Sequence, residues 1–305
     1  PLRREDFEGL LDVGGTVLGT NRTPFKQMTV PEEDGATRLD KMCANYKKLG
    51  LDCLFTLGGA GTHRTAALLC AEGCNVIGLP KTIDNDIYGT DFTFGFHTAV
   101  DVASEAIERV RTTADSHGRT ILVEVMGNKA GWLTLYAGMA GGADAILLPE
   151  IPFNIDKVCE CVQNTYRSGK RSCIIAVAEG AVVDVEAPFK KRERAFVRVD
   201  RGEATVTAHL AEVIGERTGY ETRSTVLGYI QRGGNPSAYD KVFCTRLGSY
   251  AGRLAAEGRF GVTVALCGSS ITFNALADIA GRYKLVDPAS EIVAAAEGIG
   301  ICLGR

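Results

Sequence analysis

Short apolar runs alternate along the chain with longer segments in which apolar residues recur every three or four positions. This alternation predicts parallel strands joined by crossover helices. Runs that are apolar throughout are expected in such sheets, because parallel strands are buried on both faces. The predicted strands are Cys53–Leu57, Val76–Leu79, Thr120–Met126, Ala145–Leu148, Cys173–Ala178, Thr225–Ile230 and Val262–Cys267.

The segments between these runs have helical periodicity, and Val100, Ala103, Ile107 and Val110 would share one apolar face. The predicted helices are His63–Cys70, Phe96–Thr113, Leu133–Met139, Val158–Arg167, Val206–Thr218 and Lys241–Leu254. The segment Val185–Arg201 is dense in charged residues, which predicts a solvated loop or a surface helix.

Composition narrows the class of protein. A chain of 305 residues can form one large α/β domain or two smaller ones. The formal net charge of −3 provides no broad attraction to nucleic acid, and no apolar run is long enough to span a bilayer. The ten cysteines lack the paired spacings of a zinc site, which favours reduced core thiols in a cytoplasmic protein. We therefore expect neither a nucleic-acid partner nor a membrane partner.

Two glycine-rich segments are candidate phosphate sites. Gly58, Gly59 and Gly61 lie between a predicted buried strand and a predicted helix, where backbone amides and the helix dipole favour an anion. A second segment contains Gly15 and ends at Arg22, which could pair with a phosphate. The alternative is that the glycines only form tight turns and that the arginine is a solvated loop residue.

An acidic segment follows the predicted strand Val76–Leu79. Residues 80–86 contain Lys81, Thr82, Asp84, Asn85 and Asp86, at the strand end where open α/β sheets bind ligands. A hydroxyl that attacks phosphorus needs a proton acceptor, and the phosphate oxygens need a cation or a metal. Asp84 and Asp86 could divide these duties, although Asn and Asp are also common in turns.

The order of residues in this segment, Pro80-Lys81-Thr82-Ile83-Asp84-Asn85-Asp86, resembles the catalytic signature of phosphofructokinases. The resemblance extends from about Gly14 to about Ala251. Other motifs follow in the family's order, namely Gly89–Phe96, Val123–Gly127, Ala140–Ala143, Pro149–Glu150 and Leu227–Gly234.

This resemblance implies an α/β fold of two domains, each with a mainly parallel sheet flanked by helices. Residues 1–95 and about 237–285 would bind the phosphoryl donor, and residues 96–236 and about 286–305 would bind fructose 6-phosphate. The family also implies Mg²⁺ as cofactor and a cytoplasmic homo-oligomer, expected to be a tetramer, that acts in glycolysis. The family's N-terminal strand and phosphate loop have no counterpart before Gly14, and we expect that they precede the residues of this sequence.

The family also implies roles for individual residues. Asp84 would accept the proton of the sugar 1-hydroxyl, Asp86 would support the metal and phosphate, and Thr82 would contact the phosphoryl group or the sugar. The implied donor-binding residues are Gly15, Arg22, Gly59, Gly61, Thr62 and Lys81. The implied sugar-phosphate residues are Arg119, Met126, Gly127, Glu179, Arg223, Tyr229 and Arg232, of which Arg119 and Arg223 would enter from a neighbouring subunit. Surface ion pairs are the alternative for these arginines.

The donor is the point on which two residues disagree. In this family a glycine at the position of Gly61 accompanies ATP, whereas a lysine at the position of Lys81 is typical of pyrophosphate enzymes. We give Gly61 more weight, because a carboxylate there would repel the α-phosphate of a nucleotide. The sequence therefore predicts an ATP-dependent 6-phosphofructokinase, with a pyrophosphate-dependent enzyme as the alternative.

Three positions depart from the family pattern. Ala60 replaces an Asp associated with magnesium, Asn128 replaces an Arg, and Tyr229 replaces the commoner His. These departures leave a second alternative open, a catalytically weak regulatory subunit that binds sugar phosphate.

Overall fold

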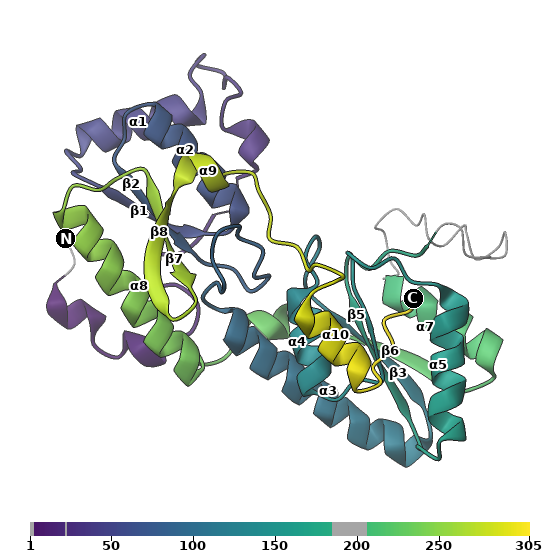
Figure 1. The fold of residues 1–305 in the computed structure, drawn as a ribbon. Coiled ribbons are helices and arrows are strands. Elements are labelled where there is room, and N and C mark those ends of the chain that lie inside the picture. Colours follow the sequence, from purple (N-terminus) through teal and green to yellow (C-terminus); the bar gives the residue numbers. More distant parts are fainter. Residues whose placement is uncertain (1–2, 22, 185–205) are drawn as a thin grey trace. The chain divides into compact units, whose positions relative to one another are not determined.

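The structure, a computed structural model, describes residues 3–21, 23–184 and 206–305. The chain divides into two compact units, the first formed by Pro1–Thr98 and Gly234–Lys284 and the second by Ala99–Gly233 and Leu285–Arg305. Each unit contains a four-stranded sheet with helices against it (Figure 1). The predicted α/β class is confirmed.

The sheet of the first unit has the strand order β1-β2-β7-β8. Strands β1 (Leu54–Gly58), β2 (Val76–Pro80) and β7 (Val262–Cys267) are parallel, and β8 (Ser270–Ala275) runs antiparallel to β7. The helices of this unit are α1 (Arg38–Lys48), α2 (Ala60–Ala71), α8 (Ala238–Ala256) and α9 (Leu276–Ile279), and short 3-10 helices cover Arg4–Phe7, Leu10–Asp12 and Phe25–Gln27.

Two apolar clusters hold this sheet between its helices. Leu247 and Leu254 of α8 pack against Ile77 and Val264 on one side. Leu69 of α2 packs with residues of α1, β2 and α9 in the other cluster. The central strands β2 and β7 are therefore buried on both faces, as their apolar sequences require.

The sheet of the second unit has the order β4-β5-β3-β6 and is parallel throughout. Its strands are β3 (Thr120–Val125), β4 (Ala145–Leu147), β5 (Cys173–Ala178) and β6 (Thr222–Val226). Its helices are α3 (Phe96–His117, which starts in the first unit), α4 (Trp132–Ala140), α5 (Ile155–Arg167), α7 (Val206–Thr218) and α10 (Glu291–Gly298). Helices α5 and α7 bury apolar residues against β3 and β5 in one cluster.

One predicted strand was wrong. Thr225–Ile230 is not a strand, because β6 ends at Val226 and a 3-10 helix covers Gly228–Arg232. The true strand is mostly polar and lies at the sheet edge, so it lacks the apolar run that reveals the central strands. Helices α1, α9 and α10 and strand β8 were not predicted.

All ten cysteines are free thiols, but Cys244 and Cys267 are exposed, so the prediction that the thiols belong to the core was wrong for these two. The charged segment Val185–Arg201 lies outside the described residues. Among the helices that the structure describes, none has the length and the apolar content needed to cross a membrane.

Candidate active site

The turn between β1 and α2 contains glycines of two kinds. At one position the packing excludes any side chain, and at another the space beside the backbone is free. A Cβ at Gly58 would lie 2.1 Å from Oγ1 of Thr62, so no side chain fits there. A Cβ at Gly61 would meet no atom within 4 Å, and this residue is exposed. Because α2 begins at Ala60, the turn presents backbone amides at a helix N-terminus, an arrangement that favours anions.

The acidic segment lies directly beside this turn. The strand ends are in register, with Gly58 opposite Pro80, and the amide of Lys81 donates to the Gly58 carbonyl at 3.0 Å. A Cβ at Gly59 would lie 3.8 Å from Cβ of Thr82. The structure therefore brings Gly59 and Thr62 close to Lys81 and Thr82, four of the predicted residues.

The acidic turn is held in shape by its own polar groups. Oγ1 of Thr82 accepts a hydrogen bond from the Asp84 amide at 3.1 Å, and the Thr82 carbonyl accepts one from the Thr93 hydroxyl at 2.8 Å. Asp84 and Asp86 are half-buried, whereas Lys81 is exposed. Both acids thus belong to a turn whose backbone has internal support.

Asn85, between the two acids, has the left-handed backbone conformation, with φ 52°. Asn tolerates this region better than most residues do. The side chain is buried, and its Oδ1 accepts hydrogen bonds from the Thr93 amide at 3.1 Å and from Nζ of Lys284 at 2.9 Å. These bonds stabilise the reversal that separates Asp84 from Asp86.

Lys284 is a functional candidate that the sequence analysis missed. Its Nζ also donates to the carbonyls of Thr90 at 3.0 Å and Asp91 at 2.6 Å, and its amide donates to the Asp86 carbonyl at 2.9 Å. Burial lowers the pKa of Lys284 to about 8, although Asp91 and Asp86 act in the opposite direction. Lys284 therefore joins the acidic turn to the loop that follows it.

Asp240 is a second missed residue, and it fixes the start of α3. Its buried carboxylate accepts hydrogen bonds from the amides of Gly95 and Thr98, each at 2.9 Å. These are N-terminal amides that a helix leaves without internal partners. The loop that contains Thr93 is anchored in this way close to the acidic turn.

The second glycine-rich segment has a different setting. Gly15 is exposed with φ 80°, and the segment approaches the chain at Gly234, where a Cβ on Gly14 would lie 2.2 Å from the carbonyl oxygen. It follows the 3-10 helix Leu10–Asp12 instead of a strand. Arg22 lies outside the described residues, so its predicted pairing with phosphate stays a prediction.

The second unit contains a pocket of about 200 Å³ at the carboxyl ends of β3 and β5. Three predicted sugar-phosphate residues, Met126, Glu179 and Tyr229, contribute to its lining. Gly127 follows with φ 124°, and a Cβ there would lie 2.8 Å from the Ala130 carbonyl, so only glycine fits. The Arg232 guanidinium lies 5.5 Å from the ring centroid of Tyr229.

Two further residues of this pocket region were not predicted. Gln231 is buried, accepts a hydrogen bond from the Met126 amide at 3.1 Å and donates one to the Gly228 carbonyl at 3.1 Å. Glu124 lines the pocket and is 8% exposed, and its Oε2 has no hydrogen-bond partner among the described residues. A buried carboxylate oxygen without a donor is a candidate for binding a hydroxyl.

Arg119 and Arg223 are not in this pocket. Arg119 precedes β3 and Arg223 is the second residue of β6, whereas the pocket lies at the other ends of the strands. Five steps along β3 cover roughly 17 Å. Both guanidiniums pair with Glu221, at 2.9 and 2.7 Å, so within one chain the surface ion pair is what the structure shows.

Apart from Lys284, this arrangement falls within the match to a protein-family model described as phosphofructokinase, which covers residues 1–255. The chain belongs to the phosphofructokinase family.

The names of similar proteins state different phosphoryl donors, ATP or pyrophosphate. An ATP-dependent 6-phosphofructokinase of Spirochaeta thermophila is 48% identical over 99% of this chain and 84% of its own length. An ATP-dependent 6-phosphofructokinase 3 of Bacteroides thetaiotaomicron is 44% identical over 98% and 84%. A pyrophosphate–fructose 6-phosphate 1-phosphotransferase of Amycolatopsis methanolica is 46% identical over 94% and 82%.

Solved phosphofructokinase structures share the fold. The crystal structure of Pichia pastoris phosphofructokinase in the T-state matches with a TM-score of 0.75 and 31% identity, over 98% of this chain. This chain spans about a third of that protein, 31% of its length. A pyrophosphate-dependent phosphofructokinase from Marinobacter aquaeolei matches with a TM-score of 0.74 and 22% identity, over 95% of this chain and 71% of its own.

Proposed function

We propose that this phosphofructokinase transfers the terminal phosphoryl group of ATP to the 1-hydroxyl of fructose 6-phosphate and so forms fructose 1,6-bisphosphate. The observation that supports the proposal is the contact of Lys81 and Thr82, in the acidic turn at the end of β2, with the glycine turn that precedes α2. Asp84 and Asp86 follow in the same acidic turn. Phosphoryl transfer requires these two elements, a proton acceptor and a cradle for the donor phosphates.

The glycine turn would hold the donor. The amides at the N-terminus of α2 attract phosphate, and the open space beside Gly61 accommodates a nucleotide without a side chain in the way. Lys81 is exposed next to the turn and would contact a donor phosphate. The relatives named ATP-dependent, at 44–48% identity, support ATP as the donor.

The acidic turn would supply the proton acceptor and a metal ligand. Asp84 would take the proton of the attacking hydroxyl, while Thr82 would contact the phosphoryl group or the sugar. The described residues contain no cluster of three or more His, Cys, Asp or Glu side chains that could hold a metal. The two carboxylates of the acidic turn fit Mg²⁺, which proteins usually bind through one or two carboxylates together with substrate phosphates. Asp86 would hold the ion, and bound magnesium would neutralise charge on the transferring phosphate.

The sugar phosphate would bind in the second unit. Glu179 can accept hydrogen bonds from sugar hydroxyls, and Met126 and Tyr229 line the same pocket. Arg119 and Arg223 lie at the far ends of the strands, so they would serve the pocket of another copy of the chain. We therefore propose a homo-oligomer with shared sites, expected to be a tetramer.

A second candidate donor is pyrophosphate. The exposed ammonium of Lys81 beside the glycine turn suits a small, highly charged donor, and one relative at 46% identity is named for pyrophosphate. Fructose 6-phosphate and the role of Asp84 are the same in both candidates.

The substitution Asp84→Asn tests the proposed chemistry. The amide cannot accept the hydroxyl proton, so turnover should fall by about 10²-fold or more while the variant still binds sugar phosphate. Asp91→Asn is the matched control. Asp91 is an exposed acid of the same unit, and its side chain accepts a hydrogen bond from the Gly268 amide at 2.6 Å. Near-normal turnover of Asp84→Asn contradicts the base assignment, and an inactive unmodified protein that binds sugar phosphate would favour the regulatory subunit.

A further inference from the structure

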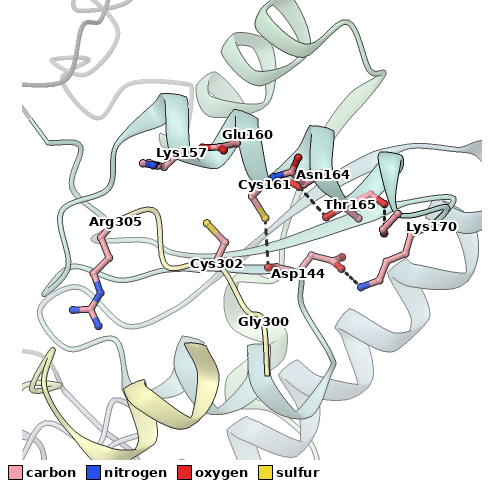
Figure 2. A pocket seen from close by; sticks show the side chains of 11 residues that line it. Asp144, Lys157, Glu160, Cys161, Asn164, Thr165, Lys170, Gly300, Cys302 and Arg305 are labelled. Carbon is pink, nitrogen blue, oxygen red and sulfur yellow. Dashed lines mark hydrogen bonds and ion pairs between the residues drawn. The ribbon is translucent and has the colours of Figure 1, made fainter. Parts of the chain in front are cut away.

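Two thiols far apart in sequence meet at a pocket of the second unit. Cys161 lies on α5, and Cys302 lies in the C-terminal segment, where it forms a bridge with Ala145 of β4. Both cysteines line a pocket of about 400 Å³, and in Figure 2 Cys161 points from α5 toward the segment that carries Cys302. Both residues also contact the carbonyl oxygen of Asp144, Cys161 through its sulfur and Cys302 through its amide.

The backbone around this pair is firmly held. The Cys302 amide donates to the Asp144 carbonyl at 3.0 Å, and the Cys302 carbonyl accepts from the Ile146 amide at 2.9 Å. The sulfur of Cys161 lies 3.7 Å from the same Asp144 carbonyl. Both side chains therefore start from fixed positions next to Asp144.

The surroundings distinguish the two sulfurs. Interaction with Cys161 and a hydrogen bond from the Gly304 amide, at 3.4 Å, lower the pKa of Cys302 below its ordinary value, although burial opposes the change. Interaction with Cys302 raises the pKa of Cys161, and burial adds to that increase. Lys157 favours the Cys302 thiolate and Glu160 opposes it. The Gly304 amide donates to the Cys302 sulfur, whereas the Cys161 thiol donates to the Asp144 carbonyl and so keeps its proton. Cys302 is thus the nucleophile of the pair, because the thiolate is the reactive form.

The first unit provides a natural comparison. The sulfur atoms of Cys43 and Cys74 lie 3.8 Å apart, so this pair also has two thiols in contact. Burial and then the hydrogen bond with Cys74 raise the pKa of Cys43 to about 11. Proximity alone would make both pairs reactive, whereas burial disfavours the Cys43 thiolate and the Gly304 amide favours the Cys302 thiolate.

We propose that Cys302 and Cys161 form a modification site for hydroperoxides, in which Cys302 is oxidised first and Cys161 then closes a disulfide. The Cys302 thiolate attacks one peroxide oxygen, a sulfur–oxygen bond forms and the oxygen–oxygen bond breaks, which leaves a sulfenic acid and hydroxide. Cys161 then loses its proton and attacks the Cys302 sulfur, and the sulfur–oxygen bond breaks to release water. Overall the two thiols lose two electrons and two protons, and the peroxide is reduced to water. This site goes beyond the proposed function and does not depend on it.

The experiment exposes the reduced full-length protein at pH 7 to graded hydrogen peroxide, blocks the remaining thiols and maps disulfides by mass spectrometry without reduction. We expect the peptide pair of Cys161 and Cys302 to cross-link at least about tenfold faster than the pair of Cys43 and Cys74. In Cys161→Ser, the sulfenic acid at Cys302 should persist and react with dimedone. In Cys302→Ser, Cys161 should stay unmodified.

Three results would overturn the proposal, and none involves enzymatic activity. The first is equal oxidation rates of the two pairs in the unmodified protein, which needs no variant to fold. The second is an absence of dimedone adduct at Cys302 in folded Cys161→Ser. The third is a Cys302 that reacts with peroxide but forms only sulfinic acid or a disulfide between separate chains.

Discussion

Removal of the Lys284 ammonium should loosen the acidic turn without touching the turn itself. Lys284→Met keeps the apolar stem and deletes three hydrogen bonds, those to Asn85 Oδ1 and to the carbonyls of Thr90 and Asp91. Asn85 Oδ1 retains the Thr93 amide, so the substitution weakens its support without abolishing it. The variant should still fold.

The magnitude follows from the count of lost bonds. Hydrogen bonds from a charged donor contribute about 1.5–3 kcal/mol each where nothing replaces them, and relief of the buried charge offsets part of the loss. We expect the free energy of unfolding of the first unit to fall by about 2 kcal/mol. For a unit of this size, that change lowers the Tm by about 4–8 °C.

Lys284→Met should change kcat more than it changes the KM for fructose 6-phosphate. Displacement of the carboxylates by about 1 Å would lower kcat by roughly 10- to 100-fold. The KM for fructose 6-phosphate should change less than about threefold, because the predicted sugar residues belong to the second unit. Thermal unfolding and steady-state kinetics measure the two effects.

The pH dependence of stability provides a further signature. Burial lowers the pKa of Lys284 from 10.5 to about 8, so between these values the unfolded chain binds the proton and the folded chain releases it. Stability from this group therefore rises as the pH increases from about 8 to 10.5. Lys284→Met should lack this rise.

Lys241→Met is the matched control. Lys241 belongs to the same unit, its side chain is 28% exposed, and it pairs with Asp12 at 2.5 Å. Loss of this surface pair should lower stability by less than about 1 kcal/mol and leave kcat unchanged. If Lys284→Met also keeps its Tm and keeps kcat within twofold, the inferred link between Lys284 and the acidic turn is wrong.

Three other substitutions test separate parts of the proposed site. Gly61→Asp should fold normally, because the added side chain meets open space. It should lower the ratio of ATP to pyrophosphate turnover by about tenfold or more, because the carboxylate crowds and repels the nucleotide phosphates. An unchanged ratio contradicts the donor assignment. Glu124→Gln should raise the KM for fructose 6-phosphate by about tenfold, because a buried acceptor in the pocket is altered, and unchanged kinetics would exclude it from the site. Arg223→Ala mixed with Asp84→Asn should regain activity if subunits share sites, and a verified mixed oligomer without activity would count against sharing.

The sequence predicted the parts of the fold whose signal is local. Central strands such as β2 and β5 are apolar throughout, so their burial on both faces is visible in the residues themselves. Edge strand β6 is mostly polar, and its identity depends on pairing with β3, which no local pattern reveals. The same limit explains why α1, a mostly polar helix, was not predicted.

In the candidate site, too, residues with a local sequence signal were predicted and residues that act through tertiary contacts were not. Asp84 and Asp86 were found because they are close in sequence and follow a predicted strand. Lys284 is separated from Asn85 by 199 positions, and nothing around it marks a lysine that reaches the acidic turn. Gln231 was overlooked for a similar reason, since its contact with Met126 spans 105 positions. Residues that support a site through tertiary contacts can be identified only once the fold is known.

Formation of fructose 1,6-bisphosphate tests the central claim most directly. The full-length protein would be incubated with fructose 6-phosphate and equal magnesium, with either ATP or pyrophosphate as the donor, and the bisphosphate product measured for each. Our account predicts efficient formation with ATP and a clearly lower rate with pyrophosphate. Turnover with pyrophosphate and none with ATP would show that Lys81, not Gly61, indicates the donor, and no product with either donor would contradict the proposed phosphoryl transfer.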